Sequence, residues 1–139
     1  MTYCLAIKVN DGLVFASDSR TNAGVDYVST FSKMHVFTPS SERVIVLLSA
    51  GNLATSQAVV NGMQRDLDED NPDNLKTIKY LFDIAHYVGQ MSKRVQQEHA
   101  GDMQQSGINP EASFILGGQI GEQATHLAPG DSRLRLNYA

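Results

Sequence analysis

The chain has 139 residues, of which 42% are hydrophobic, and a formal net charge of -4 at pH 7. This length and composition suffice for one globular domain, since a chain of this size buries roughly 68% of its unfolded surface. The acidic balance and the lack of a Lys/Arg cluster argue against nucleic acid as a partner. The single cysteine excludes a disulfide framework, and no apolar run reaches membrane length, so we expect no membrane partner either.

Two strand-like runs open the chain, at residues 2–9 and 13–17. Asn10, Asp11 and Gly12 lie between them, and Asp-Gly in this setting is typical of a hairpin turn, because the turn needs a positive φ that Gly tolerates. Asp18 lies about as far beyond this turn as Thr2 lies before it. Cross-strand pairing therefore predicts that these two residues lie side by side.

The remaining elements follow from periodicity and from turn residues. We expect, in order, a loop at 21–30, a short strand opened by Lys33 at 33–37, a turn at 38–41, a strand at 43–50, a helix at about 53–66, a second helix from about 74, a polar linker at 98–109 and a strand at 112–116. The strand at 43–50 is almost wholly apolar, so it should be central and covered on both faces. Strands followed by two helices and a further strand indicate an α+β protein with segregated layers.

Thr2, Asp18 and Lys33 could form a self-contained nucleophilic site. A threonine hydroxyl is a weak nucleophile at neutral pH, but removal of Met1 would give Thr2 a free α-amine that could act as its base. That amine has a pKa near ~8, and a lysine ammonium close by would lower it through like-charge repulsion. A carboxylate would hold the lysine charged and in place. Met-Thr is also a common way for a chain to begin, so Thr2 by itself indicates nothing.

Four segments, residues 2–8, 15–22, 32–35 and 114–119, resemble Anbu, the bacterial ancestral-β-subunit branch of the proteasome-type N-terminal-nucleophile hydrolases. The resemblance extends from residue 1 to about 121. It implies a four-layer αββα sandwich, a homo-oligomer that is a ring or a spiral, and hydrolysis of peptide bonds through an acyl-enzyme. Carried over by position, it makes Thr2 the nucleophile and source of the amine, Lys33 the group that lowers the pKa of the amine, and Asp18 the group that orients Lys33.

The same resemblance assigns residues that would bind the substrate. The Gly51 backbone N–H would face the developing oxyanion. Thr21 and Asn22 would border the substrate and pair with its backbone by strand addition. Leu53 would border the pocket for the residue that precedes the scissile bond.

The resemblance covers only the first part of the chain. Members of the family continue well past 139 residues, and residues 122–139 do not read like family sequence. We therefore expect residues 1–121 to form the N-terminal part of a proteasome-type β-subunit domain and 122–139 to be an atypical tail that arises from a frameshift or a truncation. The sandwich is accordingly expected to be incomplete.

Three functions remain open at this stage. The leading one is a threonine-type peptidase subunit that acts on peptides or unfolded proteins, with an ATPase partner suggested by analogy only. The second is a catalytically silent structural subunit or a truncated relic, and the third is an N-terminal-nucleophile amidase that acts on small amides. We expect a cytoplasmic protein without a cofactor, and no metal, because the four histidines share no ligand spacing.

Overall fold

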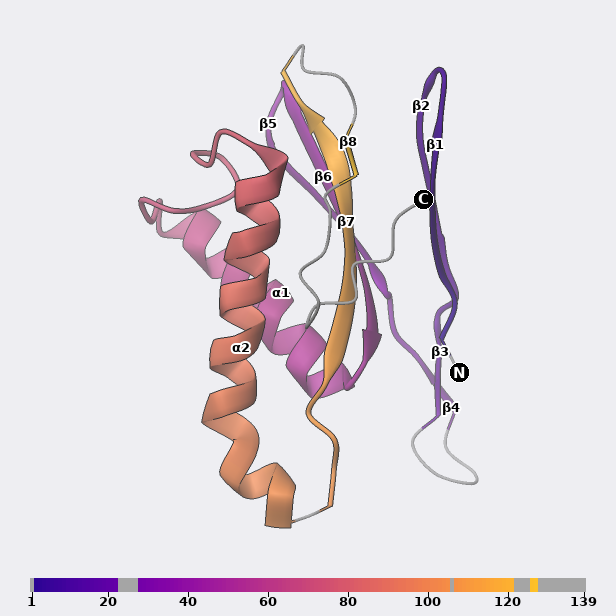
Figure 1. Cartoon of the computed structure of the whole chain (residues 1–139), viewed down its shortest axis with the longest axis vertical. Coiled ribbons are helices and arrows are strands. Elements are labelled where there is room, and N and C mark those ends of the chain that lie inside the picture. The colour runs from indigo at the N-terminus through magenta and orange to yellow at the C-terminus, as the bar shows by residue number, and fades with distance from the viewer. Residues whose placement is uncertain (1, 23–27, 106, 122–125, 128–139) are drawn as a thin grey trace.

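The computed structural model describes residues 2–22, 28–105, 107–121 and 126–127 (Figure 1). In chain order its elements are β1 (Cys4–Val9), β2 (Gly12–Ser17), β3 (Arg20–Asn22), β4 (Val28–Thr30), β5 (Met34–Ser40), β6 (Arg43–Gly51), α1 (Leu53–Asp68), α2 (Leu81–Gln105), β7 (Ala112–Ile120) and β8 (His126–Leu127). Most of the expected tail, at 122–125 and 128–139, lies outside the described residues, while residues 126 and 127 pair with β7.

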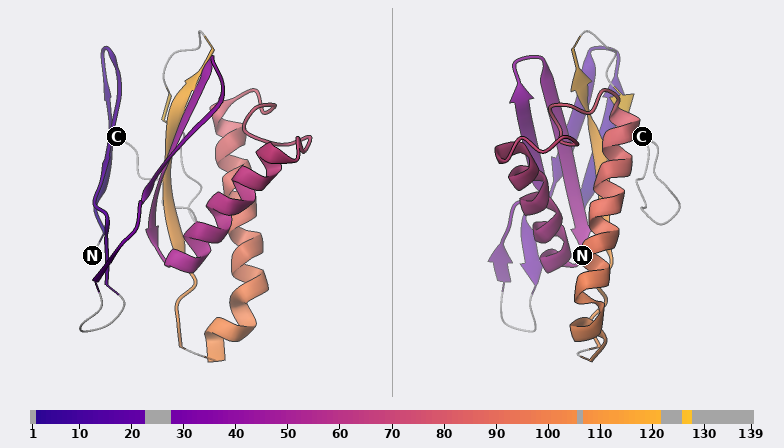
Figure 2. Two further views of the ribbon diagram at one scale, coloured as in Figure 1. Left: turned by 180° about the vertical axis from the view of Figure 1, so that it is seen from behind. Right: turned by 90° about the vertical axis from the view of Figure 1, so that its left-hand side faces the viewer.

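The elements are stacked in three layers (Figures 1 and 2). Helices α1 and α2 cover one face of an antiparallel sheet with the strand order β5-β6-β7-β8, and the β1–β2 hairpin lies across its other face. This arrangement is the α+β class that we expected. It supplies three of the four layers of an αββα sandwich, and the described residues contain no helix on the outer side of the hairpin.

The predicted hairpin is confirmed. Its register runs from Val9 opposite Gly12 to Cys4 opposite Ser17, so residues 10 and 11 form the turn, and Gly12 directly after them has a positive φ of 153°. Beyond the last pair, the Asp18 N–H donates to the Tyr3 carbonyl oxygen at 3.1 Å. The hairpin therefore brings Asp18 next to the first residues of the chain.

Strand β6 is central and covered on both faces, as its apolar sequence predicts. Ile45 and Leu47 are fully buried in one cluster with residues of α1 and α2. Val46 and Leu48 alternate with them and so point to the opposite face, where β1 contacts β6. This core anchors the strand whose end, at Gly51, belongs to the candidate site.

Strand β7 continues through Gly118, so the expected end of this strand at residue 116 was wrong. A Cβ atom on Gly118 would collide with the Val44 carbonyl oxygen, and it would lie 3.0 Å from the Ile45 Cα. The glycine therefore marks a close approach of two backbones within a strand, which is a known alternative to a strand end.

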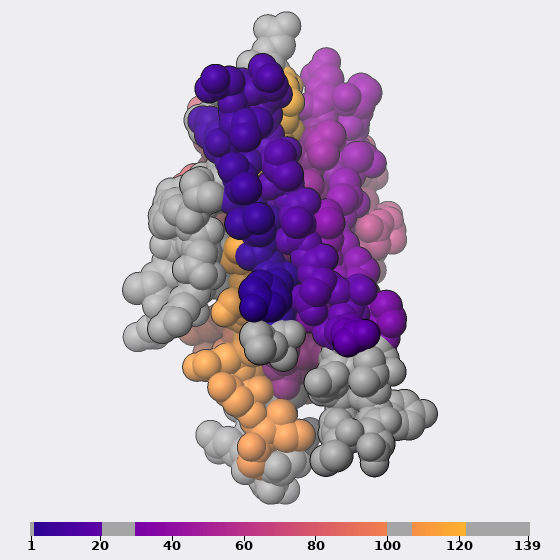
Figure 3. All heavy atoms as spheres, turned by 90° about the vertical axis from the view of Figure 1, so that its right-hand side faces the viewer, coloured from indigo at the N-terminus to yellow at the C-terminus, as the bar shows by residue number. Residues whose placement is uncertain are grey.

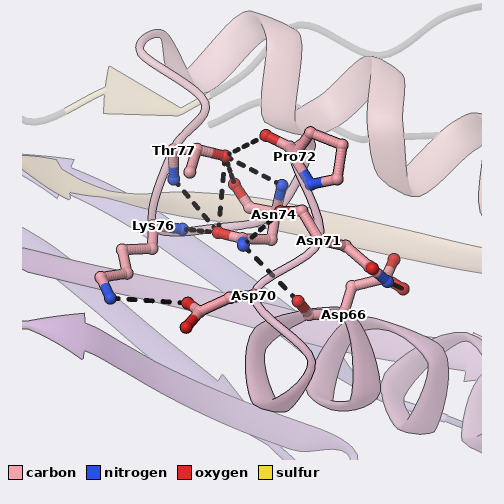
Figure 4. Close-up of polar contacts among 7 residues, drawn as sticks. All are labelled: Asp66, Asp70, Asn71, Pro72, Asn74, Lys76 and Thr77. Atoms are coloured by element: carbon pink, nitrogen blue, oxygen red, sulfur yellow. Dashed lines mark hydrogen bonds and ion pairs between the residues drawn. The ribbon is translucent and has the colours of Figure 1, made fainter.

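The second helix begins at Leu81 and not near Asn74. Asn74 is 1% exposed and lies at the centre of a folded connection (Figure 4), where its side-chain oxygen accepts from the Lys76 and Thr77 N–H groups at 2.7 and 3.1 Å. Arg43 donates to the carbonyl oxygens of residues 75 and 78 at 2.8 and 2.6 Å. Side-chain hydrogen bonds thus fix the connection that precedes the helix.

Two further expectations were wrong. Part of the loop expected at 21–30 is a small antiparallel pair, β3 with β4, and its residues 23–27 lie outside the described residues. Helix α2 extends to Gln105, through most of the linker expected at 98–109. Polar residues are compatible both with a linker and with the end of a helix that extends beyond the core. Composition alone therefore does not distinguish the two.

Candidate active site

The Lys33 side chain brings the three predicted catalytic residues together. Its Nζ lies 2.8 Å from Asp18 Oδ2 and 3.1 Å from Thr2 Oγ1, and it donates to the Arg20 carbonyl oxygen at 2.6 Å. The Lys33 side chain is only 8% exposed, whereas that of Asp18 is 28% exposed. An ammonium group has three donors, and here each of them has an acceptor. The Lys33 Nζ is therefore held beside the Thr2 hydroxyl.

Backbone contacts hold Lys33 and Asp18 in this arrangement. The Tyr3 N–H donates to Asp18 Oδ1 at 2.9 Å, so the same carboxylate binds the hairpin backbone and Lys33. The Ser49 N–H donates to the Lys33 carbonyl oxygen at 2.8 Å and attaches Lys33 to β6. The Cys4 thiol lies 3.5 Å from the Ser49 carbonyl oxygen. The site thus lies where the end of the hairpin meets the end of the central sheet.

Electrostatics favour the ionised carboxylate and the neutral thiol. The hydrogen bond from Lys33, and then that from the Tyr3 N–H, lower the pKa of Asp18 below its usual 3.8. Burial, and then the charge of Asp18, raise the pKa of Cys4. The thiol is therefore protonated at neutral pH and does not compete with Thr2 as a nucleophile.

The depressed pKa of Asp18 predicts a specific dependence of stability on pH. Because the folded-state pKa lies below the unfolded-state value of about 4, the stabilisation is complete above that value and is lost as the pH falls through the folded-state pKa. Asp18→Asn should therefore be less stable than wild type at pH 6, and the difference should vanish in strong acid. Urea unfolding at several pH values measures this difference. Its slope against pH should correspond to at most about one proton that the wild-type chain takes up on unfolding.

The control for this prediction is Asp11→Asn in the hairpin turn, because Asn and Asp are both favoured turn residues. Its stability should follow the wild-type pH profile. An Asp18→Asn difference that stays constant down to strong acid would mean that the carboxylate charge does not stabilise the fold.

Gly51 ends β6 with a φ of 94°. Along this strand the Ser49 N–H donates toward Lys33, and the Asn52 N–H donates to the Glu111 carbonyl oxygen on the other side. Successive N–H groups of a strand alternate between its two neighbours, so the Gly51 N–H points to the side of Lys33. This direction is suited to a donor for an oxyanion at Thr2.

The expected substrate-binding residues lie on elements that begin or end at this site. Thr21 and Asn22 belong to β3, which follows directly after Asp18. Leu53 is partly exposed and is the first residue of α1, two positions after Gly51. The Arg20 carbonyl, which binds Lys33, was missed in the sequence, because a backbone acceptor has no side-chain signal.

The part of the chain that the structure describes contains no group of three or more His, Cys, Asp or Glu residues that could hold a metal ion. Within the same residues, no helix has both the length and the apolar character that a membrane span needs.

Solved structures similar to this chain are Anbu proteins. The Anbu (ancestral beta-subunit) from Yersinia bercovieri is 38% identical with a TM-score of 0.80, over 91% of this chain and 51% of that one. The helical assembly of the Anbu complex from Pseudomonas aeruginosa is 39% identical with a TM-score of 0.82, over 91% of this chain and 52% of that one. Anbu from Hyphomicrobium sp. strain MC1 is 35% identical with a TM-score of 0.72, over 91% of this chain and 51% of that one. The chain thus spans about half the length of these relatives. No family model and no curated protein matches it.

Proposed function

The chain belongs to the Anbu family of ancestral β-subunits, and we propose that it forms the nucleophile-bearing part of a threonine-type peptidase subunit. One observation carries this proposal: the Lys33 ammonium contacts both the Thr2 hydroxyl and the Asp18 carboxylate. A buried, charged lysine beside the hydroxyl is what an N-terminal nucleophile needs, because it lowers the pKa of the neighbouring α-amine.

The reaction would use the α-amine that removal of Met1 creates. Thr2 Oγ attacks the carbonyl carbon of the peptide bond while its proton passes to the α-amine, and the carbonyl electrons move onto the oxygen. The Gly51 N–H stabilises that oxygen. The C–N bond then breaks, the protonated α-amine of Thr2 returns the proton to the leaving nitrogen, and an ester remains on Thr2. A water molecule then attacks the ester in the same way, with the α-amine as its base, and the carboxylic acid product leaves as Thr2 Oγ regains a proton.

The substrate in this proposal is a peptide or an unfolded protein in an extended conformation. The described residues pair β3 with β4 on one edge only, so the other edge of β3 can accept a substrate strand. Thr21 and Asn22 would contribute the backbone groups of that pairing, and Leu53 would line the pocket next to Gly51. A panel of peptides and small amides tests this preference against a small-amide hydrolase.

The assembly is also a proposal. The Pseudomonas aeruginosa relative is described as a helical assembly, and we infer that this chain, with residues 1–121 as its subunit-forming part, likewise acts in a homo-oligomer. A heterologous contact between copies gives an open spiral or a closed ring according to a small difference in rotation. A cytoplasmic location and an ATPase that supplies unfolded protein are consistent with this role by analogy.

Intact mass spectrometry of the purified chain, before and after treatment with a peptide epoxyketone, tests the function. We expect loss of Met1 and the addition of one inhibitor molecule to wild type, and no addition to Thr2→Ala. Retained Met1, or a folded chain with free Thr2 that forms no adduct, would instead support a catalytically silent structural subunit.

A further inference from the structure

Asn52 and Thr55, at the start of α1, bind three consecutive carbonyl groups of the segment that precedes β7. The Asn52 side-chain amide donates to the carbonyl oxygen of Asn109 at 3.0 Å, and the Asn52 backbone N–H donates to that of Glu111 at 2.8 Å. The Thr55 hydroxyl donates to the carbonyl oxygen of Pro110 at 2.9 Å. We call residues 109–111 the clamped segment.

The same asparagine also caps the helix. Its side-chain oxygen accepts from the Thr55 N–H at 3.0 Å, so one amide group uses its oxygen for α1 and its nitrogen for the clamped segment. Thr55 is fully buried, and its hydroxyl therefore needs the Pro110 carbonyl as a partner. A helix cap requires only the side-chain oxygen of Asn52. The hydrogen bond from its amide nitrogen to Asn109 is therefore a second, separate interaction of this side chain.

The clamped segment lies against Gly51. A Cβ atom on Gly51 would be 2.6 Å from the Glu111 carbonyl oxygen and 3.2 Å from the Ala112 Cα, so the two backbones are as close as a glycine permits. Gly51 is also held at a φ of 94°, a region that a residue without a Cβ adopts readily. Without a fixed neighbour, the freedom of this glycine would let its N–H change direction.

We infer that Asn52, assisted by Thr55, is a positioning residue that fixes the direction of the Gly51 N–H by holding the clamped segment against it. This inference rests on the proposed function, since it assigns a role within the same site. Asn52 itself does not contact the reacting atoms. It acts because a small misplacement of an oxyanion donor costs a large part of its effect on the rate.

Two substitutions separate this role from capping. Asn52→Asp keeps a side-chain oxygen for the cap, and Asp caps helices as well as Asn does, but it places an acceptor opposite the Asn109 carbonyl. Thr55→Val keeps the shape of the side chain and removes only the bond to Pro110. Ser56→Ala is the matched control, because the Ser56 hydroxyl donates to the Asn52 carbonyl oxygen at 2.8 Å and not to a carbonyl of the clamped segment.

The experiment measures inactivation by a peptide epoxyketone over a range of inhibitor concentrations. It gives the limiting rate of adduct formation and the half-saturating concentration for each variant, with thermal melting as the measure of folding. We expect Asn52→Asp to lower the limiting rate about tenfold or more and Thr55→Val to lower it less, with similar half-saturating concentrations. Ser56→Ala should change the melting temperature but keep the wild-type limiting rate.

Wild-type limiting rates in folded Asn52→Asp and Thr55→Val, or an equal loss in Ser56→Ala, would overturn the positioning role while the proposed function stands. If Asn52→Asp does not fold, the isosteric Thr55→Val decides the question by the same criterion. A wild-type chain with free Thr2 and no adduct would overturn the proposed function, and the positioning role with it.

Discussion

Replacing Lys33 by methionine should lower the rate at which an epoxyketone modifies Thr2 by about 10²- to 10⁴-fold, the range typical for loss of proton-transfer assistance. Methionine matches the four-atom apolar stem of lysine but lacks the Nζ and so has no donor for Thr2, Asp18 or the Arg20 carbonyl. The pKa of the α-amine should also rise toward its ordinary value near ~8, since the neighbouring positive charge is gone. The residual rate should therefore reach its maximum at a higher pH than the wild-type rate.

The matched control for this prediction is Lys76→Met. Lys76 forms an ion pair with Asp70 at 3.6 Å, but its side chain is 56% exposed, so its loss should change neither the rate nor the pH profile. A folded Lys33→Met protein that reacts at the wild-type rate would show that the amine of Thr2 is activated by another group.

The sequence predicts part of the geometry of the candidate site because that part depends on local rules. Asn10 and Asp11 form the turn and Gly12 follows it, the register of the hairpin starts from there, and the register brings Asp18 beside the start of the chain. The apolar run of β6 likewise predicts a central strand whose end carries Gly51. Each of these inferences needs only the period of a strand and the conformation of one turn.

The features that were missed depend on contacts between distant segments. Helix α2 begins only after a connection whose carbonyl groups bind Arg43, more than thirty residues earlier. Strand β7 passes through Gly118 because the backbone of β6 lies against it. The clamped segment is recognised by Asn52 only once α1 and β7 are placed side by side. Local sequence propensities do not predict such contacts, since residue types such as Asn and Gly occur alike in turns, caps and linkers.

The outer face of the β1–β2 hairpin should cause the purified chain to self-associate. Side chains that alternate with the inward-facing Ala6 point away from the central sheet, and the hairpin lies on the surface of the molecule (Figure 3). The exposed apolar side chains on this face, with their exposed fractions, are Tyr3 (70%), Leu5 (50%), Ile7 (40%), Val9 (45%) and Val14 (50%). A contiguous apolar face of this kind is unusual on a soluble monomer.

The double substitution Ile7→Glu with Val14→Lys tests this expectation. The two residues are direct cross-strand partners, so the new charges can pair while the hairpin register is kept. Loss of two half-exposed aliphatic side chains from a contact should weaken association by about 2 kcal/mol, or roughly 30-fold in dissociation constant. Sedimentation over a concentration series, together with binding of a hydrophobic dye, measures the change.

A charge added elsewhere is the control for that experiment, because any added charge can improve solubility. Gln57→Lys lies on the exposed side of α1, far from the hairpin in the layer order, and should leave association and dye binding as they are in wild type. If wild type is monomeric and binds no dye, or if the hairpin variant associates as wild type does, the outer face of the hairpin does not drive association. If the hairpin variant alone becomes monomeric, then this face is where the three layers of the described structure lack the cover that the fourth layer of an αββα sandwich provides.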